Sequence, residues 1–445
     1  MRKERIHELN NRAYLPGRYV LYRMQASVRI RNNQALFHAI RLANELNLPL
    51  KVVFRLDASF PEANFRHFDF LIQGLKDFAS GVSLLGCEFE IRTGTLEEAF
   101  LEPLSNAACV VTDKGYLRIQ RDWSGWLGEH APCKVIEVED NLIVPVESAS
   151  HKGEWAARTL RPKITDKLPY FTSELEDEIP VLTCRKEASP ELSALNERIL
   201  TSTLEKLRSD AWLTPVAMKG GEQEANRLLD VFVKDKLASY DNDRNDPSLA
   251  ATSRLSAYLH FGFISPVEIW KAVEKYPESA PFIEQLVVRR ELAHNYIWFT
   301  KNYDSYNSLP EWSRKSLELH EPDKRPFLYD LNLLEEAATH DASWNAAMRE
   351  MIQTGFMENT MRMYWGKKLI EWSATPQEAY NRMSYLNNRY FLDGRDANSF
   401  TGIGWCFGLH DRPWQERPVF GMVRYMNEAG LYRKYNMNAY IGKWS

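Results

Sequence analysis

The first third of the chain alternates short apolar runs with longer amphipathic segments. Five runs rich in β-branched and aromatic residues predict strands, at residues 18–22, 50–54, 88–93, 109–112 and 134–138. Three intervening segments have apolar positions at helical spacing, at residues 34–46, 65–78 and 96–104. Alternation of strands and helices predicts an α/β domain, with a parallel Rossmann-like sheet covered by helices on both faces.

From about residue 220 the apolar positions recur with helical periodicity almost throughout. Nine segments are predicted helices, at residues 222–237, 253–259, 266–275, 281–300, 331–338, 342–354, 361–372, 376–386 and 418–429. Pro266 follows Ser265 and Pro376 follows Thr375, which places a proline at the first position of a helix. This half is therefore predicted to be an all-α domain.

A polar stretch with scattered prolines, residues 148–209, separates these two patterns and is predicted to be an interdomain linker. The expected domains are then 1–147 and 210–445. A chain of 445 residues is too long for one hydrophobic core, which agrees with two domains.

Composition restricts the classes of function. The net charge of −4 gives no global basic surface, so any contact with nucleic acid must be a local patch. No stretch reaches the roughly 20 apolar residues that span a bilayer. Five cysteines lack CxxC and zinc-ligand spacing, which predicts a reduced cytoplasmic protein without a bound metal. No membrane contact and no obligate protein partner are expected.

An anion site is suggested by the segment TSRLS, residues 252–256. Hydroxyl groups, an arginine and the backbone N–H groups at the start of a helix suit a diphosphate. The alternative is simple N-capping by Thr252 or Ser253.

Tryptophans are the next candidates. Trp365 and Trp372 are seven residues apart, which puts them on one helix face about 10 Å from each other. Trp344 is on a neighbouring predicted helix. Such a set could pass an electron to the surface in short hops, or it could be ordinary core packing.

The segment 385–398, rich in Asn, Asp and Gly, is interpreted as a loop that either bonds to itself or reads the polar edge of a ligand. Arg362 could form an ion pair with its Asp393. Further on, glycines around Trp405 would let a backbone approach a ligand and leave the indole open for stacking. Basic and aromatic residues interleave after Trp405, which favours nucleic acid over a merely solvated face.

Several motifs resemble the class II cyclobutane pyrimidine dimer photolyases of the photolyase/cryptochrome family. These include TSRLSAYLHFGFIS, THDASWNAA, MRMYWGKKLIEW, YLNNRYFLDGRDAN and GLHDRPWQERPVFGMVRYMN. The resemblance covers nearly the whole chain. It implies an antenna-type α/β domain, a helical domain that holds FAD, and light-driven repair of pyrimidine dimers in damaged DNA. An antenna chromophore, deazaflavin or folate, is a further expectation.

The resemblance also implies roles for individual residues. The residues expected to hold FAD are Tyr240, Thr252, Ser253, Leu255, Ser256, Asn345, Arg362, Asn387, Asp393 and Asp396. Trp365, Trp344 and Trp372 would form the photoreduction relay, while Asn387 would face flavin N5. The residues expected at the lesion or the DNA are Arg244, Asn245, Gln285, Arg289, Met363, Trp405, Arg412 and Arg424.

Two departures from the family pattern bear on chemistry. Gln285 stands where these photolyases usually have a glutamate, so it can donate a hydrogen bond to the dimer but carries no charge and transfers no proton. Glu358 stands where a histidine is usual.

Three functions therefore compete. Trp405, Met363 and the basic C-terminal segment favour dimer repair, as does the expected absence of a signalling tail after Ser445. Gln285 favours a cryptochrome-like photoreceptor with weak or no repair activity. Repair of another photoproduct is the third alternative.

Overall fold

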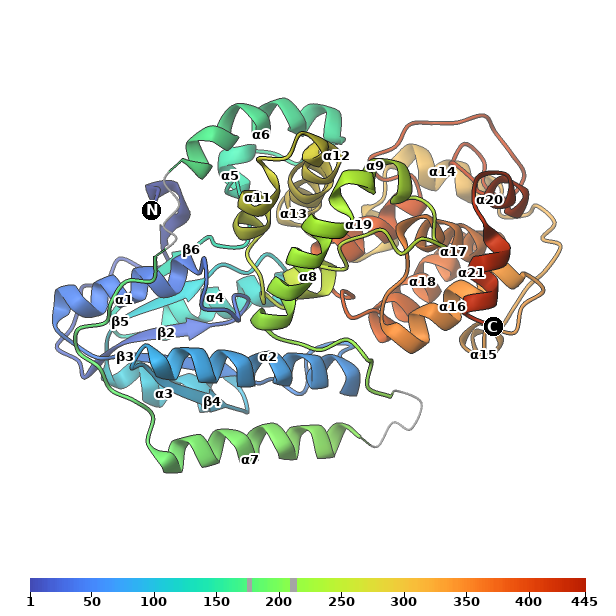
Figure 1. Ribbon diagram of the computed structural model, residues 1–445. Helices are drawn as coiled ribbons and strands as arrows, with labels where there is room; N and C mark the ends of the chain where they lie inside the picture. Colours follow the sequence, from blue (N-terminus) through green and yellow to red (C-terminus); the bar gives the residue numbers. More distant parts are fainter. Residues whose placement is uncertain (174–177, 209–213) are drawn as a thin grey trace. The chain divides into compact units, whose positions relative to one another are not determined.

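The computed structural model describes residues 1–173, 178–208 and 214–445, which form two compact units (Figure 1). The α/β unit consists of Met1–His151, Lys163–Asp230 and Leu255–Lys275. The helical unit consists of Lys152–Pro162, Val231–Arg254 and Tyr276–Ser445.

One six-stranded sheet is the centre of the α/β unit. In the order β1-β6-β5-β2-β3-β4, its strands are Ile6–Glu8, Lys134–Val138, Ala107–Asp113, Tyr19–Met24, Leu50–Arg55 and Glu88–Arg92. The five predicted strands are all present and pair in parallel. β1 runs antiparallel to β6 with Ile6 opposite Val138, and its three residues contain too short an apolar pattern to predict a strand.

Both faces of the sheet are covered because the strands alternate their side chains between two layers. Tyr19, Leu21 and Val110 pack with Phe100 of α3 (Leu96–Asn106) and Leu127 of α4 (Arg118–His130). The opposite face is covered by α1 (Gln34–Leu46) and α2 (Phe65–Leu84), as right-handed β-α-β crossovers require. The predicted α/β fold class is confirmed.

The expected linker contains three helices, α5 (Val146–Ala149), α6 (Ala157–Thr172) and α7 (Pro190–Leu207), and its residues 174–177 and 209 lie outside the described residues. α7 covers the edge strand β4. Its Asn196 accepts a hydrogen bond from the Ile91 amide at 2.8 Å and donates one to the Phe89 carbonyl at 2.9 Å. The edge of the sheet is thereby protected from pairing with another chain.

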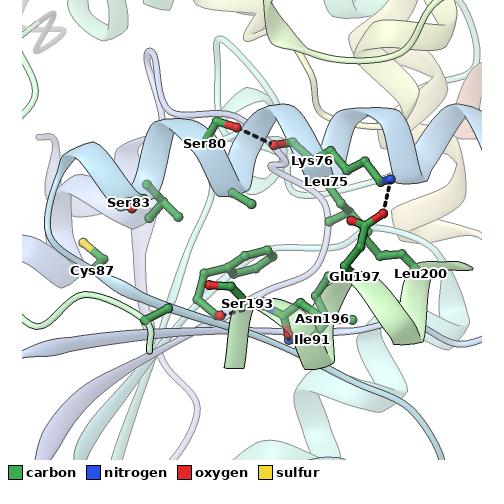
Figure 2. A pocket seen from close by; sticks show the side chains of 14 residues that line it. Leu75, Lys76, Ser80, Ser83, Cys87, Ile91, Ser193, Asn196, Glu197 and Leu200 are labelled. Atoms are coloured by element: carbon green, nitrogen blue, oxygen red, sulfur yellow. Dashed lines mark hydrogen bonds and ion pairs between the residues drawn. The ribbon is translucent and has the colours of Figure 1, made fainter. Parts of the chain in front are cut away.

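A cavity of about 300 Å³ lies between α2, α7 and β4 (Figure 2). Lys76 of α2 and Glu197 of α7 form an ion pair of 2.6 Å at its side. Asn196 is engaged with β4, as described above, and Ser80 donates to the Lys76 carbonyl. The Lys76, Ser80, Asn196 and Glu197 side chains at the cavity are thus engaged with partners in the protein.

Helices make up the second unit. Within it lie α9 (Tyr240–Asp243), α12 (Ala280–Ile283), a π-helical turn (Glu284–Arg289), α13 (Arg290–Phe299), α14 (Glu311–Leu319), α15 (Leu331–Glu335), α16 (Ala342–Thr354), α17 (Asn359–Glu371), α18 (Pro376–Tyr390), α19 (Ala397–Cys406), α20 (Glu428–Lys434) and α21 (Met437–Lys443). α17 lies among α16, α18 and α19 and carries the buried centre of the unit. α8 (Glu222–Asp235) begins in the α/β unit, which also contains α10 (Ser256–His260) and α11 (Pro266–Val273).

Two predictions for the C-terminal region are wrong. Residues 418–429 were expected to be one helix, but Val419 and Gly421 have positive φ angles of 68° and 49°, which stop a helix, and α20 begins at Glu428. Residues 385–398 were expected to be a loop, but α18 continues to Tyr390 and α19 starts at Ala397, capped by Asp396. Only the turn 391–396 is non-helical.

Within the described ranges, no helix is long and apolar enough to cross a membrane. All five cysteines are free thiols. The same ranges contain no group of three His, Cys, Asp or Glu side chains that could hold a metal ion.

Candidate active site in the helical unit

Three buried tryptophans form a chain of contacts, which is called the aromatic path below. Trp344 of α16 lies between the other two, because its indole N–H donates to the Trp365 carbonyl at 3.1 Å and its ring meets Trp372 edge-on at 5.5 Å. Each is at most 2% exposed. The structure therefore brings the predicted relay residues together, with Trp344 as the link.

Trp372 is 1% exposed, so the path does not reach solvent at this residue. Tyr329 and His340 continue it, at 5.2 Å and 5.3 Å from the Trp372 ring, and Phe327 stacks on His340 at 3.8 Å. Tyr329 and His340 also share a hydrogen bond of 2.5 Å. Neither was predicted as a relay residue, although His340 belongs to the THDASWNAA motif itself.

An ion pair is fixed beside this path. Arg362 of α17 donates to Asp393 at 3.0 Å, and its guanidinium stacks on the Phe391 ring at 3.8 Å. Both charged side chains are largely buried, at 18% and 11% exposure. Asp393 lies in the turn between α18 and α19, in which Arg395 has a positive φ of 60° and donates to the Asn388 carbonyl. The predicted pairing of Arg362 with Asp393 is present in the structure.

Three amide and carboxylate side chains predicted to hold FAD are engaged with their own neighbours. Asn387 donates to Asn388 at 2.9 Å and to Ser399. Asn345 exchanges hydrogen bonds with Thr339, and Asp396 caps α19 through the Asn398 amide at 2.8 Å. These bonds hold the turns around the path in place.

The predicted anion segment, residues 252–256, is held in an unusual backbone conformation. Ala250 and Arg254 have positive φ angles of 50° and 59°, which non-glycine residues rarely adopt. Lys236, directly after α8, donates to the Ala250 carbonyl at 2.8 Å. The Thr252 hydroxyl donates to Glu358 at 3.1 Å. α10 begins only at Ser256, with Leu255 as its N-cap residue, so neither Thr252 nor Ser253 caps it.

Gln285 lies on the π-helical turn Glu284–Arg289, between α12 and α13. Such turns are rare in proteins, and those that occur are often at functional sites. The extra residue changes the direction in which the neighbouring side chains point. Arg289, at the end of the turn, pairs with Glu284 at 3.2 Å, and Arg161 holds the same carboxylate at 2.7 Å. The sequence pattern did not predict this turn, since residues 281–300 were expected to form one continuous helix.

Tyr240, Arg244 and Asn245 lie on α9 and directly after it. Tyr240 is buried against Phe232 and Phe282, and burial raises the pKa of its hydroxyl. Arg244 stacks on Tyr240 and pairs with Asp241 at 3.6 Å, while Thr360 donates to the Asn245 carbonyl at 2.8 Å.

Basic and aromatic residues interleave on the segment after α19. Arg412 and Arg424 lie over the Trp414 ring at 5.6 and 4.3 Å, and Arg424 also pairs with Asp411 at 3.1 Å. Arg417 stacks on Tyr425 at 4.2 Å. Trp414 is 41% exposed, so this stacked group presents positive charge and aromatic surface together.

Comparison with known proteins decides the family. The chain is 42% identical over 442 residues to a deoxyribodipyrimidine photo-lyase of Methanothermobacter thermautotrophicus, an alignment that covers 99% of this chain and 98% of the relative. Residues 20–181 also match the family model described as DNA photolyase. This chain belongs to the DNA photolyase family.

Solved structures of the photolyase family share the fold at lower sequence identity. A class III photolyase from Agrobacterium tumefaciens superposes with a TM-score of 0.73 at 18% identity, covering 97% of this chain and 87% of its own. An archaeal photolyase from Sulfolobus tokodaii, whose structure contains two FAD molecules, gives a TM-score of 0.72 at 14% identity and covers 96% of this chain and 89% of its own.

The flavin expected for a photolyase-family member can be tested against buried polar atoms of the helical unit. Trp365 Nε1 and Thr401 Oγ1 are buried and have no hydrogen-bond partner among the described residues. A side chain added at Gly402, beside Thr401 on α19, would meet no atom within 4 Å. Since buried polar atoms nearly always have partners, these donors and the open face at Gly402 fit a polar planar group bound against α17 and α19.

Met363 and Trp405 are partly exposed residues of these same two helices. Most of the predicted site residues thus belong to the helical unit. Leu255 and Ser256 belong to the α/β unit, into which the chain passes directly after Arg254. The glycines around Trp405 were predicted to let a backbone approach a ligand, but Thr401 was not predicted as a site residue because a glycine-rich segment gives no sign that it will be helical.

Proposed function

We propose that this photolyase-family chain repairs cyclobutane pyrimidine dimers in DNA under blue light, as an enzyme of the class II type that uses FAD. The name of its Methanothermobacter relative, which it matches over 98% of that protein's length, supports the reaction. The observation that carries the proposal is the path Trp365–Trp344–Trp372. Its first residue, Trp365, lies on α17 together with Arg362, which pairs with Asp393.

Ten residues would hold FAD, namely Tyr240, Thr252, Ser253, Leu255, Ser256, Asn345, Arg362, Asn387, Asp393 and Asp396. Reduced FAD, once bound, supplies the electron that opens the dimer after it absorbs light. Around it, Arg362 and Asp393 keep two opposite charges at fixed positions, and Phe391 shields the guanidinium from water. A fixed pair of this kind orients a polar ring without reorganising during the reaction.

The three indoles supply a route for electrons through the unit. The Trp344 indole contacts the Trp365 backbone carbonyl and the Trp372 ring, and all three side chains are buried from solvent. Tyr329 and His340 extend this route toward the surface, where the exposed Phe327 lies.

The damaged bases would leave the DNA helix, which costs little for a poorly stacked lesion, and would stack on Trp405 beside Met363. Gln285 would donate a hydrogen bond from its amide to the dimer. The phosphates would be held by Arg244 with Asn245, and by Arg289, Arg412 and Arg424. The stacked arginines at Trp414 support this role, because they present positive charge on a rigid aromatic surface.

A second candidate function is a cryptochrome-like photoreceptor with weak or no repair activity. Gln285 favours it, because an amide provides neither the negative charge nor the proton of the usual glutamate.

The test is dimer loss from an oligonucleotide with one thymine dimer, mixed with reduced protein and illuminated with blue light. We expect the parent protein to repair at a rate comparable to that of Gln285→Glu. Binding of the lesion without turnover in the parent, with turnover restored by Gln285→Glu, would favour the photoreceptor instead. An absorption band beyond those of the flavin in the same preparation would reveal the expected deazaflavin or folate antenna.

A further inference from the structure

A buried carboxylate stands directly behind the predicted phosphate-binding hydroxyl. Glu358 is the N-cap residue of α17, is only 3% exposed, and does not use its side chain to cap the helix. Its two carboxylate oxygens instead accept from the Thr252 hydroxyl, at 3.1 and 3.4 Å. Both residues belong to the helical unit.

This hydrogen bond conflicts with the role proposed for Thr252. A hydroxyl group has one hydrogen to donate, and phosphate oxygens only accept. While Glu358 is ionised, that hydrogen is used by the carboxylate. A negative charge 3.1 Å from the hydroxyl would also repel a diphosphate.

The surroundings of Glu358 oppose its ionisation. Burial raises the pKa of Glu358, and Arg254, Thr252, Lys236 and Lys443 lower it without cancelling that effect. Arg254 is 3.8 Å away and stacks on Phe356, so it is a weak partner. Lys236 donates to the Ala250 and Thr252 carbonyls. The other titratable groups that interact with Glu358 are Glu350, Tyr440 and Tyr240.

We propose that Glu358 takes up one proton when the diphosphate of the flavin binds at Thr252, so that flavin retention weakens as the pH rises. The inference rests on the proposed function, which places FAD at this segment. The proton comes from solvent and binds one Glu358 oxygen. The new O–H of Glu358 donates to Thr252 Oγ1, and the Thr252 hydroxyl turns to donate its own hydrogen to a phosphate oxygen. Glu358 then carries no negative charge behind the phosphate.

Glu358 is a positioning residue in this account, since it acts on the cofactor through Thr252. The coupling has a thermodynamic consequence, because a site that binds a proton together with its ligand loses affinity as protons become scarce. Affinity then falls by up to about tenfold per pH unit, over the interval in which the free protein has lost the proton and the complex still holds it.

The measurement is the rate of flavin release from the purified holoprotein after dilution, followed by flavin fluorescence from about pH 5 to about pH 9. We expect release to accelerate by up to about tenfold per pH unit within part of this range. In Glu358→Gln, the uncharged amide can donate to Thr252 at every pH, so we expect slow release with no such slope.

Glu350→Gln is the matched control. Glu350 is a second buried carboxyl group of the same cluster, but Tyr440 donates to it and it makes no hydrogen bond to Thr252 among those in the structure. Removing its charge should shift the pH profile and preserve its slope. A second variant, Thr252→Val, lacks the hydroxyl and should release flavin faster at low pH with a reduced slope.

The outcomes separate the two proposals. Parallel profiles for the parent and Glu358→Gln, or an undiminished slope in Thr252→Val, would overturn proton coupling while flavin binding stands. A flat parent profile would do the same even if Glu358→Gln fails to fold. A parent protein that holds no flavin at any pH would overturn the proposed function itself.

Discussion

Two buried carboxyl groups, Glu139 of the α/β unit and Glu350 of the helical unit, have opposite surroundings. In the α/β unit, Glu139 is fully buried and bonds to Lys114 at 3.1 Å, Tyr116 at 3.0 Å and the Val146 amide at 2.7 Å. Burial alone would raise its pKa, but His7, Lys114 and Val146 outweigh burial and hold the pKa at about 2. Glu139 is therefore a charged part of the framework.

In the helical unit, Glu350 is equally buried, but its hydrogen bond comes from the neutral Tyr440 hydroxyl, at 2.5 Å. Burial is the main cause that raises the pKa of Glu350 to about 7, and the nearby Glu358 contributes in the same direction. The difference teaches that a buried carboxyl group becomes a fixed charge where cationic and N–H partners surround it, as at Glu139. It can change its protonation state where its hydrogen-bond partner is neutral, as at Glu350.

The largest expected effect concerns the aromatic path. Trp365→Phe should abolish photoreduction of the oxidised protein and spare dimer repair by chemically reduced protein, because repair itself needs no electron from the path. Its cost in stability should be small, about 2 kcal/mol for a truncated buried ring. Light-induced bleaching of the flavin absorption measures the first effect, and Trp298→Phe, outside the path, is the control. Equal photoreduction in Trp365→Phe and the parent would remove Trp365 from the relay.

Glu139→Gln tests whether the charge of Glu139 stabilises the α/β unit. We expect a loss of about 3–5 kcal/mol in the free energy of unfolding at neutral pH, because the buried Lys114 keeps only the exposed Glu147, at 3.6 Å, as a charged partner. Denaturant unfolding measures this loss. Glu129→Gln, on the exposed side of α4, should change stability by less than about 0.5 kcal/mol. Equal effects of the two substitutions would refute the structural role given to Glu139.

Glu350 should make stability depend on pH with the opposite sign. Its folded pKa of about 7 lies above the ordinary value of 4.5, so its contribution is complete below pH 4.5 and is lost as the pH rises toward 7. This loss is about 3 kcal/mol. The contribution of Glu139 is complete above pH 4.5 and is lost as the pH falls toward 2.

Thermal unfolding of the parent and Glu350→Gln across this range checks the prediction. The variant should lack the fall in stability between about pH 4.5 and 7. An identical pH profile in both proteins would mean that Glu350 ionises normally.

The smallest effect on stability is expected for Asp393→Asn. The Arg362–Asp393 pair is largely buried, but the amide oxygen of Asp393→Asn can still accept from Arg362, so we expect a loss of less than about 2 kcal/mol. If the pair exists to orient the flavin, the variant should change the flavin absorption spectrum while its unfolding curve stays close to that of the parent. A large loss of stability with an unchanged spectrum would assign the pair to the framework.

Much of the fold follows from apolar periodicity. The five parallel strands, α1 and α16 were predictable because each has a clear pattern of one period over its whole length. β1 is too short to carry such a pattern. The segment 418–429 has helical spacing, but the positive φ angles of Val419 and Gly421, set by tertiary contacts, override it.

The candidate site was predictable where a motif determines local geometry, as in the Arg362–Asp393 pair. The sequence could not reveal that Thr252 donates to Glu358, since the two are 106 residues apart and meet only through tertiary folding. The same holds for the step from Trp372 to Tyr329 and His340. The π-turn at Gln285 was hidden because its residues continue an ordinary helical pattern.

The central claim is that the helical unit holds a flavin next to an electron path that serves dimer repair. The most direct measurement is the absorption spectrum of the purified protein before and during blue illumination, with an oligonucleotide containing a thymine dimer present. The account predicts flavin bands, their bleaching on photoreduction, and loss of the dimer in the light but not in the dark. Protein that carries no flavin and cannot be reconstituted with FAD would contradict it.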